Sequence, residues 1–358
     1  MSWGGIVMVT SGFPRRSETF ALGEMLALEE CGMLAAVFAT KPGDGSPLQP
    51  GCERLMRRVR FLPEGSPATQ AAALVEMLGE QPVSGIHGYF AHQPAEVAEL
   101  AARYLRLPFG FSTHARDARK VAAGELARRA NEAACVVACN GDVAGEINRT
   151  GARVHLLPHG VDTVRFRPRP LPPASPLRLL AVGRLVEKKG FEILIKAAAK
   201  LTFDFQLRII GEGPLHDRLA SLITATGTQD RITLCGARTH AELPDEYANV
   251  HAVVVPSVID STGDRDGLPN VILEAMASGR AVVASDVSAI SSAIISEETG
   301  ILVPPGDMSA LASALARVAR EVELRAVLAE RARQRVEREF DVKNCAARFR
   351  DFLESVYV

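Results

Sequence analysis

The sequence predicts an α/β protein made of two Rossmann-like domains, each with a parallel sheet. Three observations carry this prediction. Short β-branched runs alternate with helical segments rich in Ala, Leu and Glu, the alternation stops in a proline-rich stretch, and it then starts again. Strands and helices that alternate at this spacing favour parallel sheets with right-handed crossovers. The length of 358 residues also suggests two domains, at about 150 residues each.

The first domain is expected at residues 1–168. Its predicted strands are Ile6–Val9, Ala35–Ala39, Gly85–His87, Pro108–Ser112, Cys135–Ala138 and Val154–Leu157. Its predicted helices are Thr19–Cys31, a segment near Pro67–Leu78, and Pro94–Tyr104. The run 167–176 then holds five prolines, which neither a helix nor a central strand accommodates. Residues 169–177 are therefore expected to link the two domains.

The second domain is expected at residues 178–340. Its predicted strands are Leu177–Val182, Gln206–Ile210, Ile232–Leu234, Ala252–Pro256 and Ala281–Ser285. Its predicted helices are Phe191–Leu201, Pro214–Thr226, Asn270–Ser278 and the tail Pro305–Glu339, with Asp341–Tyr357 as a last helix. Ligands of such sheets bind beyond the carboxyl ends of the strands, so the loops there are the places to search for chemistry.

Composition excludes several classes of protein. The chain has 41 Lys and Arg against 42 Asp and Glu, a net charge of -1, which rules out a globally basic nucleic-acid binder. No apolar stretch reaches the ~18 residues of a membrane-spanning helix. The first residues lack the basic region and the cleavage site of a signal peptide. The 6 scattered cysteines form no C-x-x-C pair and are typical of reduced cytosolic thiols, so a cytoplasmic protein is expected.

The clearest candidate site opens the second half. A predicted strand ends at Gly183 and a helix begins near Gly190, with Arg184 and Lys189 flanking the turn between them. Backbone N–H groups at a helix start, together with two cations, suit a phosphate or diphosphate. The alternative is that both cations are solvated residues of a tight turn.

A second candidate loop follows the strand that ends at Pro256. Its last residues offer backbone amides at a helix start: Gly267, Leu268, Pro269 (which has no N–H of its own) and Asn270. Glu274 lies about one turn inside that helix, where its carboxylate could accept from two ligand hydroxyls. Asp264 and Asp266 could instead simply cap the helix. They also spell D-x-D, a pair that can hold a divalent metal, but no further ligand cluster is evident.

The first half offers weaker signals. His114 lies just past a predicted strand, and Gly12 follows the first strand and permits a close backbone approach. Two basic runs could contact anionic lipid head groups or a lipid-diphosphate acceptor, or could be ordinary solvated surface. They are Arg54, Arg57, Arg58 and Arg60, and Arg116, Arg119, Lys120, Arg128 and Arg129. No G-x-G-x-x-G, Walker A, G-x-S-x-G or H-E-x-x-H motif occurs, which disfavours dehydrogenases, P-loop enzymes, serine hydrolases and zinc proteases.

Taken in order, the segments match a known pattern. They are STHARD, LLPHGVDTVRF, VGRLVEKKG, IIGEGP, DRDGLPNVILEAMASGRAVVAS and TGILVPPGD. The chain resembles the retaining glycosyltransferases of family 4, which have the GT-B fold: two Rossmann-like domains facing an interdomain cleft. The segments FPRRSETF and HGYFAHQPAEVA are similar to the branch that builds bacterial exopolysaccharides such as colanic acid.

The resemblance implies roles for the second-half residues. Arg184 and Lys189, in the turn that starts at Gly183, would grip the donor diphosphate and neutralise the departing charge. Glu274 matches the second Glu of the Glu-x7-Glu motif and would bind the donor ribose. Asp266 stands at the first Glu position and would face the transferred sugar, although its carboxylate lies ~1.5 Å nearer its own backbone. The backbone of residues 267–270 would donate to sugar and phosphate.

In the first half, the resemblance gives His114 a contact with the donor sugar and puts Gly12 beneath the donor phosphates. His159 stands where the family usually has Asn. The first domain would bind the acceptor, and residues 341–358 would pack back on it.

The resulting hypothesis is a retaining hexosyltransferase. It would move a hexose from a UDP- or GDP-linked sugar to a saccharide or lipid-linked acceptor in bacterial polysaccharide biosynthesis. We expect no metal, no cofactor and no nucleic-acid partner. Peripheral contact with the inner face of the cytoplasmic membrane stays open. Two alternatives remain: a same-fold sugar-nucleotide epimerase, and a catalytically silent nucleotide-sugar-binding relative, which Asp266 suggests.

Overall fold

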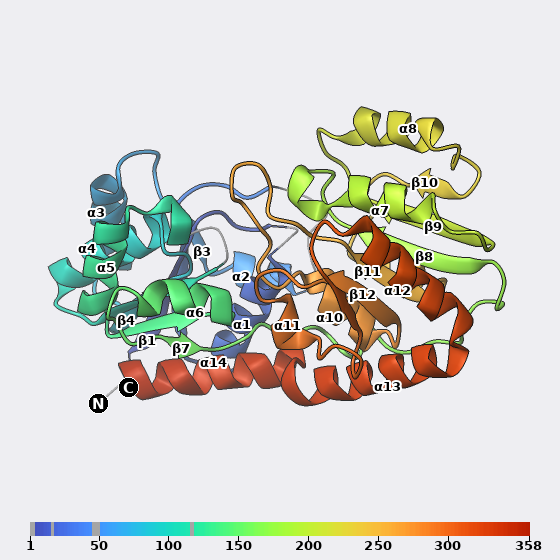
Figure 1. Ribbon diagram of the computed structural model, residues 1–358. Helices are drawn as coiled ribbons and strands as arrows, with labels where there is room; N and C mark the ends of the chain where they lie inside the picture. The colour runs from blue at the N-terminus through green and yellow to red at the C-terminus, as the bar shows by residue number, and fades with distance from the viewer. Residues whose placement is uncertain (1–3, 16–17, 45–50, 115–117) are drawn as a thin grey trace. The chain divides into compact units, whose positions relative to one another are not determined.

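A computed structural model describes residues 4–15, 18–44, 51–114 and 118–358. The chain divides into two compact units, called unit 1 (Met1–Gly160 and Val342–Val358) and unit 2 (Val161–Asp341). Both have a parallel sheet with helices on its faces (Figure 1). The chain enters unit 2 at Val161, before the expected boundary at residue 168, because Val161 and Phe166 are buried in the core of unit 2.

The sheet of unit 1 has the order β3-β2-β1-β4-β5-β6-β7 over the described residues, and every neighbouring pair is parallel. Its strands are β1 (Gly5–Thr10), β2 (Leu34–Ala39), β3 (Val59–Phe61), β4 (Val83–Gly88), β5 (Phe109–Thr113), β6 (Cys135–Ala138) and β7 (His155–Leu156). The strand order reverses between β1 and β4, which is where open α/β sheets bind ligands.

The helices of unit 1 cover both faces of this sheet (Figure 1). They are α1 (Thr19–Glu30), α2 (Cys52–Met56), α3 (Pro67–Leu78), α4 (Gln93–Leu105), the 3-10 turn η1 (Ala118–Lys120), α5 (Ala123–Glu132), α6 (Gly141–Asn148) and α14 (Val342–Tyr357). Helix α14 packs against α1 and buries Phe349, Leu353 and Tyr357 in the core of unit 1. The last helix of the chain is thus part of unit 1.

Three elements of unit 1 escaped the sequence prediction: α2, β3 and α6. Strand β3 is only three residues long, and none of them is buried. Helix α5 is rich in charge: Leu126, Arg129 and Ala130 form its buried face, and Arg128 and Arg129 form ion pairs with Glu125.

The sheet of unit 2 has the order β10-β9-β8-β11-β12-β13 and is also parallel throughout the described strands. Its strands are β8 (Leu177–Val182), β9 (Phe205–Ile210), β10 (Ile232–Leu234), β11 (Ala252–Val255), β12 (Ala281–Ser285) and β13 (Ile301–Val303). Here the order reverses between β8 and β11. The two loops that the sequence singled out follow these two strands, so they meet at the reversal point.

The helices of unit 2 flank its sheet. They are the 3-10 turn η2 (Glu187–Lys189), α7 (Phe191–Ala198), α8 (His216–Ala225), α9 (Leu243–Ala248), α10 (Asn270–Ala277), α11 (Ile290–Ala293), α12 (Met308–Arg320) and α13 (Val322–Glu339). The predicted tail helix Pro305–Glu339 needs correction. Helix α12 begins only after Asp307, whose carboxylate accepts from two amides, and it ends at Arg320. Glu321, with non-helical dihedral angles (φ -97°, ψ 79°), separates α12 from α13.

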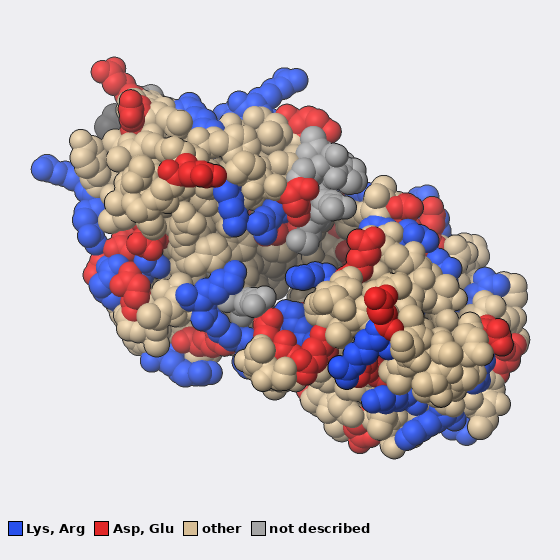
Figure 2. All heavy atoms as spheres, turned by 90° about the horizontal axis from the view of Figure 1, so that it is seen from above, with Lys and Arg blue, Asp and Glu red and all other residues tan. Residues whose placement is uncertain are grey.

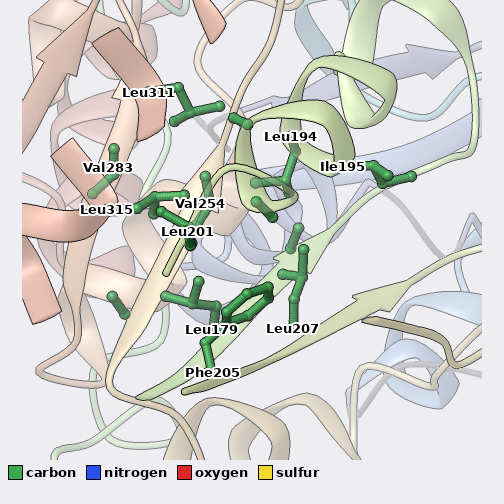
Figure 3. Close-up of a cluster of buried hydrophobic side chains, with 14 of the residues drawn as sticks. Leu179, Leu194, Ile195, Leu201, Phe205, Leu207, Val254, Val283, Leu311 and Leu315 are labelled. Carbon is green, nitrogen blue, oxygen red and sulfur yellow. The ribbon is translucent and has the colours of Figure 1, made fainter. Parts of the chain in front are cut away.

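The core of unit 2 holds the strand ends in place. Leu179, Phe205 and Leu207 point from the sheet toward Leu194 of α7 and Leu315 of α12, all buried (Figure 3). Apart from Arg178, strand β8 is apolar on both faces, as expected of a central parallel strand covered by helices on each side. A close-packed core of this kind fixes the loops that leave the strands.

Candidate functional site

The turn after β8 presses against the end of β11. Gly190 has a φ of +67°, and a Cβ there would lie 1.8 Å from the carbonyl oxygen of Pro256, so only glycine fits. The amide of Val258 donates to the carbonyl of Lys188 at 2.8 Å. Glu187 accepts from the Ser261 amide at 3.1 Å and from its hydroxyl at 2.7 Å. The two predicted loops thus form one site.

Lys189 and Asp266 meet at the centre of this site. The Lys189 Nζ lies 2.7 Å from Asp266 Oδ2, and the same carboxylate accepts from the buried Ser257 hydroxyl at 3.0 Å. Lys188 adds a contact of 3.5 Å to Asp266 and one of 3.2 Å to Asp264. The aliphatic stem of Lys189 lies over Gly183, where a Cβ would come within 3.2 Å of it. Asp266 is thus turned toward the two lysines.

Arg184 differs from these lysines. Its side chain is exposed, and within the described part of the chain it makes no hydrogen bond or ion pair. Arg184 follows the carboxyl end of β8 by two residues. An exposed guanidinium of this kind is able to bind an incoming anion without first losing a partner.

Helix α10 starts at Asn270 after Pro269, and no side chain among the described residues caps it. The reading of Asp264 and Asp266 as helix caps is therefore wrong: their carboxylates bind lysines instead. The backbone of Gly267 and Leu268 leads into a helix start whose first-turn amides lack intrahelical partners. This end of α10 is suited to negative charge.

Glu274 is buried one turn into α10, with 5% of its surface exposed. Tyr247 of α9 donates to its Oε2 at 2.7 Å, and His240 Nε2 lies 3.4 Å from Oε1. Burial, followed by the Glu274 charge, raises the pKa of Tyr247 well above its usual value. Sequence reasoning missed Tyr247 and His240, because neither stands in a motif or next to the loop they support. They fix the direction of the Glu274 carboxylate.

His114 of unit 1 follows β5 and lies among aromatic rings. Its ring centroid is 4.9 Å from that of Phe90, 5.2 Å from Phe20 and 5.0 Å from His159. Burial and then the neighbouring His159 lower the pKa of His114 well below its usual value. The imidazole is therefore neutral at pH 7, able to donate or accept one hydrogen bond at each nitrogen according to its tautomer.

Beneath His114 lies a buried charge pair that the sequence did not reveal. His159 Nδ1 is 3.0 Å from Glu24 Oε1, and the Tyr89 hydroxyl donates a short hydrogen bond to the other carboxylate oxygen. Burial alone would lower the pKa of His159, but the Glu24 carboxylate and Cys139 together outweigh burial and raise that pKa to about 10. Phe20 stacks on the His159 ring at 4.0 Å. In the sequence, the one indication of this pair was that His159 stands where the resembled family usually has Asn.

A pocket of about 370 Å³ opens at the carboxyl ends of β1, β2, β4 and β5 in unit 1, with Phe90 and His114 among its lining residues. Gly12 lies beside it: a Cβ there would meet the Pro42 carbonyl at 3.0 Å and Arg15 Nε at 3.2 Å. The structure thus brings Gly12 and His114 to the same end of the unit 1 sheet. Arg184, Lys189, Asp266, residues 267–270 and Glu274 come together in unit 2.

The first basic run is largely used in contacts within unit 1. Arg54 and Arg58 both pair with Glu29, at 2.5 and 3.4 Å, and Arg60 donates to the carbonyl of Met77. On the face seen in Figure 2, basic and acidic side chains are interspersed. These contacts favour the reading of the run as ordinary surface.

The second basic run is mostly paired as well. Arg128 and Arg129 contact the buried Glu99 at 2.8 and 3.0 Å, and Arg119 contacts Glu146 at 2.7 Å. Arg116 lies outside the described residues. Lys120 is the exception, since it lines the pocket.

The described residues lack both a metal-binding cluster and a membrane-spanning helix. No set of three or more His, Cys, Asp or Glu side chains is grouped so as to hold a metal ion. None of the described helices combines the length and the apolar character needed to cross a bilayer.

Residues 176–321 match the family model described as "Glycosyl transferases group 1". The matched stretch lies within unit 2 and contains Arg184, Lys189, Asp266 and Glu274. The resemblance expected from the motifs is thereby confirmed for this part of the chain.

Several curated proteins resemble the chain. It is 34% identical over 206 residues to WcaL of Escherichia coli, a protein named as a glycosyltransferase of colanic acid biosynthesis. It is 36% identical over 171 residues to the amylovoran biosynthesis glycosyltransferase AmsK of Erwinia amylovora. The matches cover 55% and 47% of this chain. The chain spans about half the length of these relatives, 51% of the first and 42% of the second.

Solved structures share the fold of the whole chain. HepE of Anabaena, solved in complex with UDP, has a TM-score of 0.82 at 19% identity, over 98% of this chain and 100% of its own. Sucrose-phosphate synthase of Thermosynechococcus elongatus has a TM-score of 0.80 at 23% identity, over 99% of each chain. Together with the two parallel α/β units, these matches confirm the predicted GT-B fold.

Proposed function

We propose that this chain is a retaining glycosyltransferase. It transfers a hexose from a UDP- or GDP-linked sugar to a saccharide or lipid-linked acceptor in bacterial polysaccharide biosynthesis. One observation carries the proposal: the turn after β8 and the loop after β11 join through the Lys189–Asp266 pair, with exposed Arg184 and the uncapped start of α10 beside them. The match to the group 1 family model and the names of the relatives support the same class of reaction.

For this transfer, the protein needs mainly to orient the substrates and to stabilise the developing charge. A sugar nucleotide already carries a good leaving group, so the main task is to stabilise the negative charge that grows on the β-phosphate. In this proposal, Arg184 and Lys189 bind the diphosphate, and the first amides of α10 donate to its oxygens or to the sugar. The acceptor hydroxyl attacks from the face that the diphosphate leaves, which keeps the anomeric configuration.

The two carboxylates take different parts. Glu274, fixed by Tyr247 and His240, is the residue we propose for the donor ribose. Asp266 holds Lys189 in the structure, so donor phosphate oxygens would take its place on the ammonium. The freed Asp266 carboxylate would then turn to a hydroxyl of the transferred sugar. His114 and Gly12 would contact the donor from unit 1.

No metal or cofactor is part of this mechanism. Asp264 and Asp266, the D-x-D pair, are bound to lysines that already supply positive charge. The proposal places the reaction in the cytoplasm, with no nucleic-acid partner. Peripheral contact with the inner face of the membrane would come through the acceptor.

A second candidate follows from Asp266 itself. Because two lysines and Ser257 hold its carboxylate, the site could bind a nucleotide sugar without turning it over. Such a silent relative would bind donor but give neither transfer nor slow hydrolysis. A same-fold epimerase would instead release a modified sugar without any acceptor.

The first test is a thermal-shift screen of the purified chain against UDP, GDP and ADP and their common sugar conjugates, with and without magnesium. A ligand that binds the folded state raises the melting temperature by mass action. We expect a metal-independent shift with one nucleotide, followed by sugar release or transfer in product analysis. If no nucleotide shifts the melting temperature, the proposed function is wrong.

A further inference from the structure

The pocket of unit 1 is lined by cations from separate segments. Arg15 comes from the loop after β1, Lys41 from the loop after β2, and Lys120 from η1, beyond β5. The two lysine residues are exposed, and over the described part of the chain neither forms an ion pair. Glu18 also lines the pocket and lies 3.6 Å from Arg15. Cations therefore outnumber carboxylates around this cavity.

The floor of the pocket does not offset this charge. It includes Phe90 and the imidazoles of His92 and His114. Burial, and then Lys120, Lys41 and Arg15, lower the pKa of His92 to about 4. The three cations thus lie near enough to the His92 ring to add to the effect of burial on its pKa. Neutral imidazoles below add hydrogen-bonding groups without adding carboxylates.

Lys120 differs from the other described residues of its basic run, which form ion pairs with carboxylates. Arg119, Arg128 and Arg129 of the same basic run all contact carboxylates. The cation that faces the pocket keeps its charge for an external partner. A lysine ammonium of this kind binds phosphate as a point charge.

We infer that this pocket binds a phosphate group of the acceptor, through Lys41, Lys120 and Arg15. The inference rests on the proposed function, which assigns a different set of cations, Arg184 and Lys189, to the donor diphosphate. It names the acceptor as a phosphorylated compound, either a free sugar phosphate or a lipid-diphosphate-linked saccharide. A neutral saccharide would leave this charge unused.

The test measures binding of glucose 1-phosphate, with glucose as the neutral match, to the full chain by calorimetry. The double variant Lys41→Gln/Lys120→Gln should bind glucose 1-phosphate at least tenfold more weakly, while its UDP or GDP affinity changes less than twofold. Arg57→Gln, which removes an exposed charge elsewhere in unit 1, is the matched control and should bind as the wild type does. Lys120→Arg should retain most of the affinity, which separates charge from folding.

The outcomes separate this inference from the proposed function. If the wild type binds UDP or GDP but not glucose 1-phosphate, the phosphate pocket is wrong and the donor site stands. If the double variant loses nucleotide affinity instead, the lysines belong to the donor and the inference is overturned. If glucose 1-phosphate binds through the lysines but no nucleotide does, the proposed function fails, and the assignment of the pocket to an acceptor fails with it.

A further arm identifies the source of the phosphate. Farnesyl diphosphate-linked glucose is compared with glucose 1-phosphate on the wild type and the double variant. Equal affinities support a free sugar phosphate. At least tenfold tighter binding of the prenyl compound, lost in the double variant, supports a lipid-linked acceptor.

Discussion

The two units end their parallel strands in polar sites that are built in opposite ways. In unit 2, the lysines of the site are bound by carboxylates of the same site, Asp264 and Asp266. In unit 1, the buried carboxylate of Glu24 is bound below the pocket by His159 and Tyr89. The lysine residues at the mouth of the unit 1 pocket are left without a carboxylate partner among the described residues.

This difference predicts how each site would bind an anion. In unit 2 an incoming diphosphate has to compete with Asp266 for Lys189, and only Arg184 is open to it at once. In unit 1 an anion meets a positive potential directly. A preformed ion pair keeps a cation in position but lowers its affinity for other anions, whereas open lysines attract anions and are more strongly screened by salt.

The largest expected effect is on turnover in unit 2. Arg184→Ala and Lys189→Ala should each lower kcat for transfer or donor hydrolysis by about 10²–10³, as loss of one preorganised donor to a developing anion does. Their effects on stability should differ. Arg184→Ala should stay within about 0.5 kcal/mol of the wild type, while Lys189→Ala should cost about 1–3 kcal/mol by leaving Asp266 short of a partner.

Steady-state kinetics and melting temperatures of the two variants check this prediction. Lys200→Ala removes an exposed lysine of unit 2 and should change neither quantity. Unchanged turnover in both site variants would remove the diphosphate from this site. Equal loss of stability in both would mean that the contrast between a paired lysine and an open arginine is wrong.

The next effect concerns the buried pair of unit 1. Glu24→Gln leaves His159 without its counter-charge, which should destabilise unit 1 by about 3 kcal/mol near pH 7, or about 6–12 °C for a unit of this size. Calorimetric scans of the wild type and the variant measure the difference. Glu30→Gln, at an exposed carboxylate that ends the same helix, serves as the control and should change the melting temperature little.

The pH dependence of this pair has a definite sign. Because the pKa of His159 in the folded chain is about 10, above the ordinary histidine value of 6.5, its protonation stabilises the fold fully below about pH 6.5. That contribution is lost as the pH rises from there to 10. The gap between the wild type and Glu24→Gln should therefore narrow over this range. A gap that stays constant from pH 6 to 10 would show that His159 carries no charge in the fold.

Much of the unit 2 site was predictable, because its residues stand next to strand ends. The alternation of strands and helices places Arg184 and Glu274 beyond parallel strands, whose carboxyl ends share one edge. What the sequence could not supply was that β8 and β11 are neighbours, and hence that Lys189 reaches Asp266. The alternative that Asp266 caps the helix failed for this reason, since its carboxylate binds Lys189.

The supporting residues were less accessible to sequence reasoning. Tyr247 contacts Glu274 from a short helix, α9, that the alternation did not reveal, and Glu24 meets His159 across 135 positions of chain. Contacts of this kind depend on packing between elements, which hydrophobic periodicity does not encode. The basic runs show the same limit, because a cluster of arginines in the sequence does not reveal the carboxylates that the fold brings to them.

The smallest predicted effect isolates the competition itself. Asp266→Asn keeps the shape of the side chain but removes the negative charge beside Lys189, so UDP or GDP, whichever the wild type binds, should bind about tenfold more tightly. Asp264 and solvent screening limit the gain to about 1.4 kcal/mol. Calorimetric titration measures it. In unit 1, Glu18→Gln should raise the affinity for glucose 1-phosphate less than twofold, because the Glu18 carboxylate lies 3.6 Å from the Arg15 guanidinium, a separation that gives only a weak surface ion pair. Weaker nucleotide binding by Asp266→Asn would mean that Asp266 positions Lys189 for the diphosphate rather than competing with it.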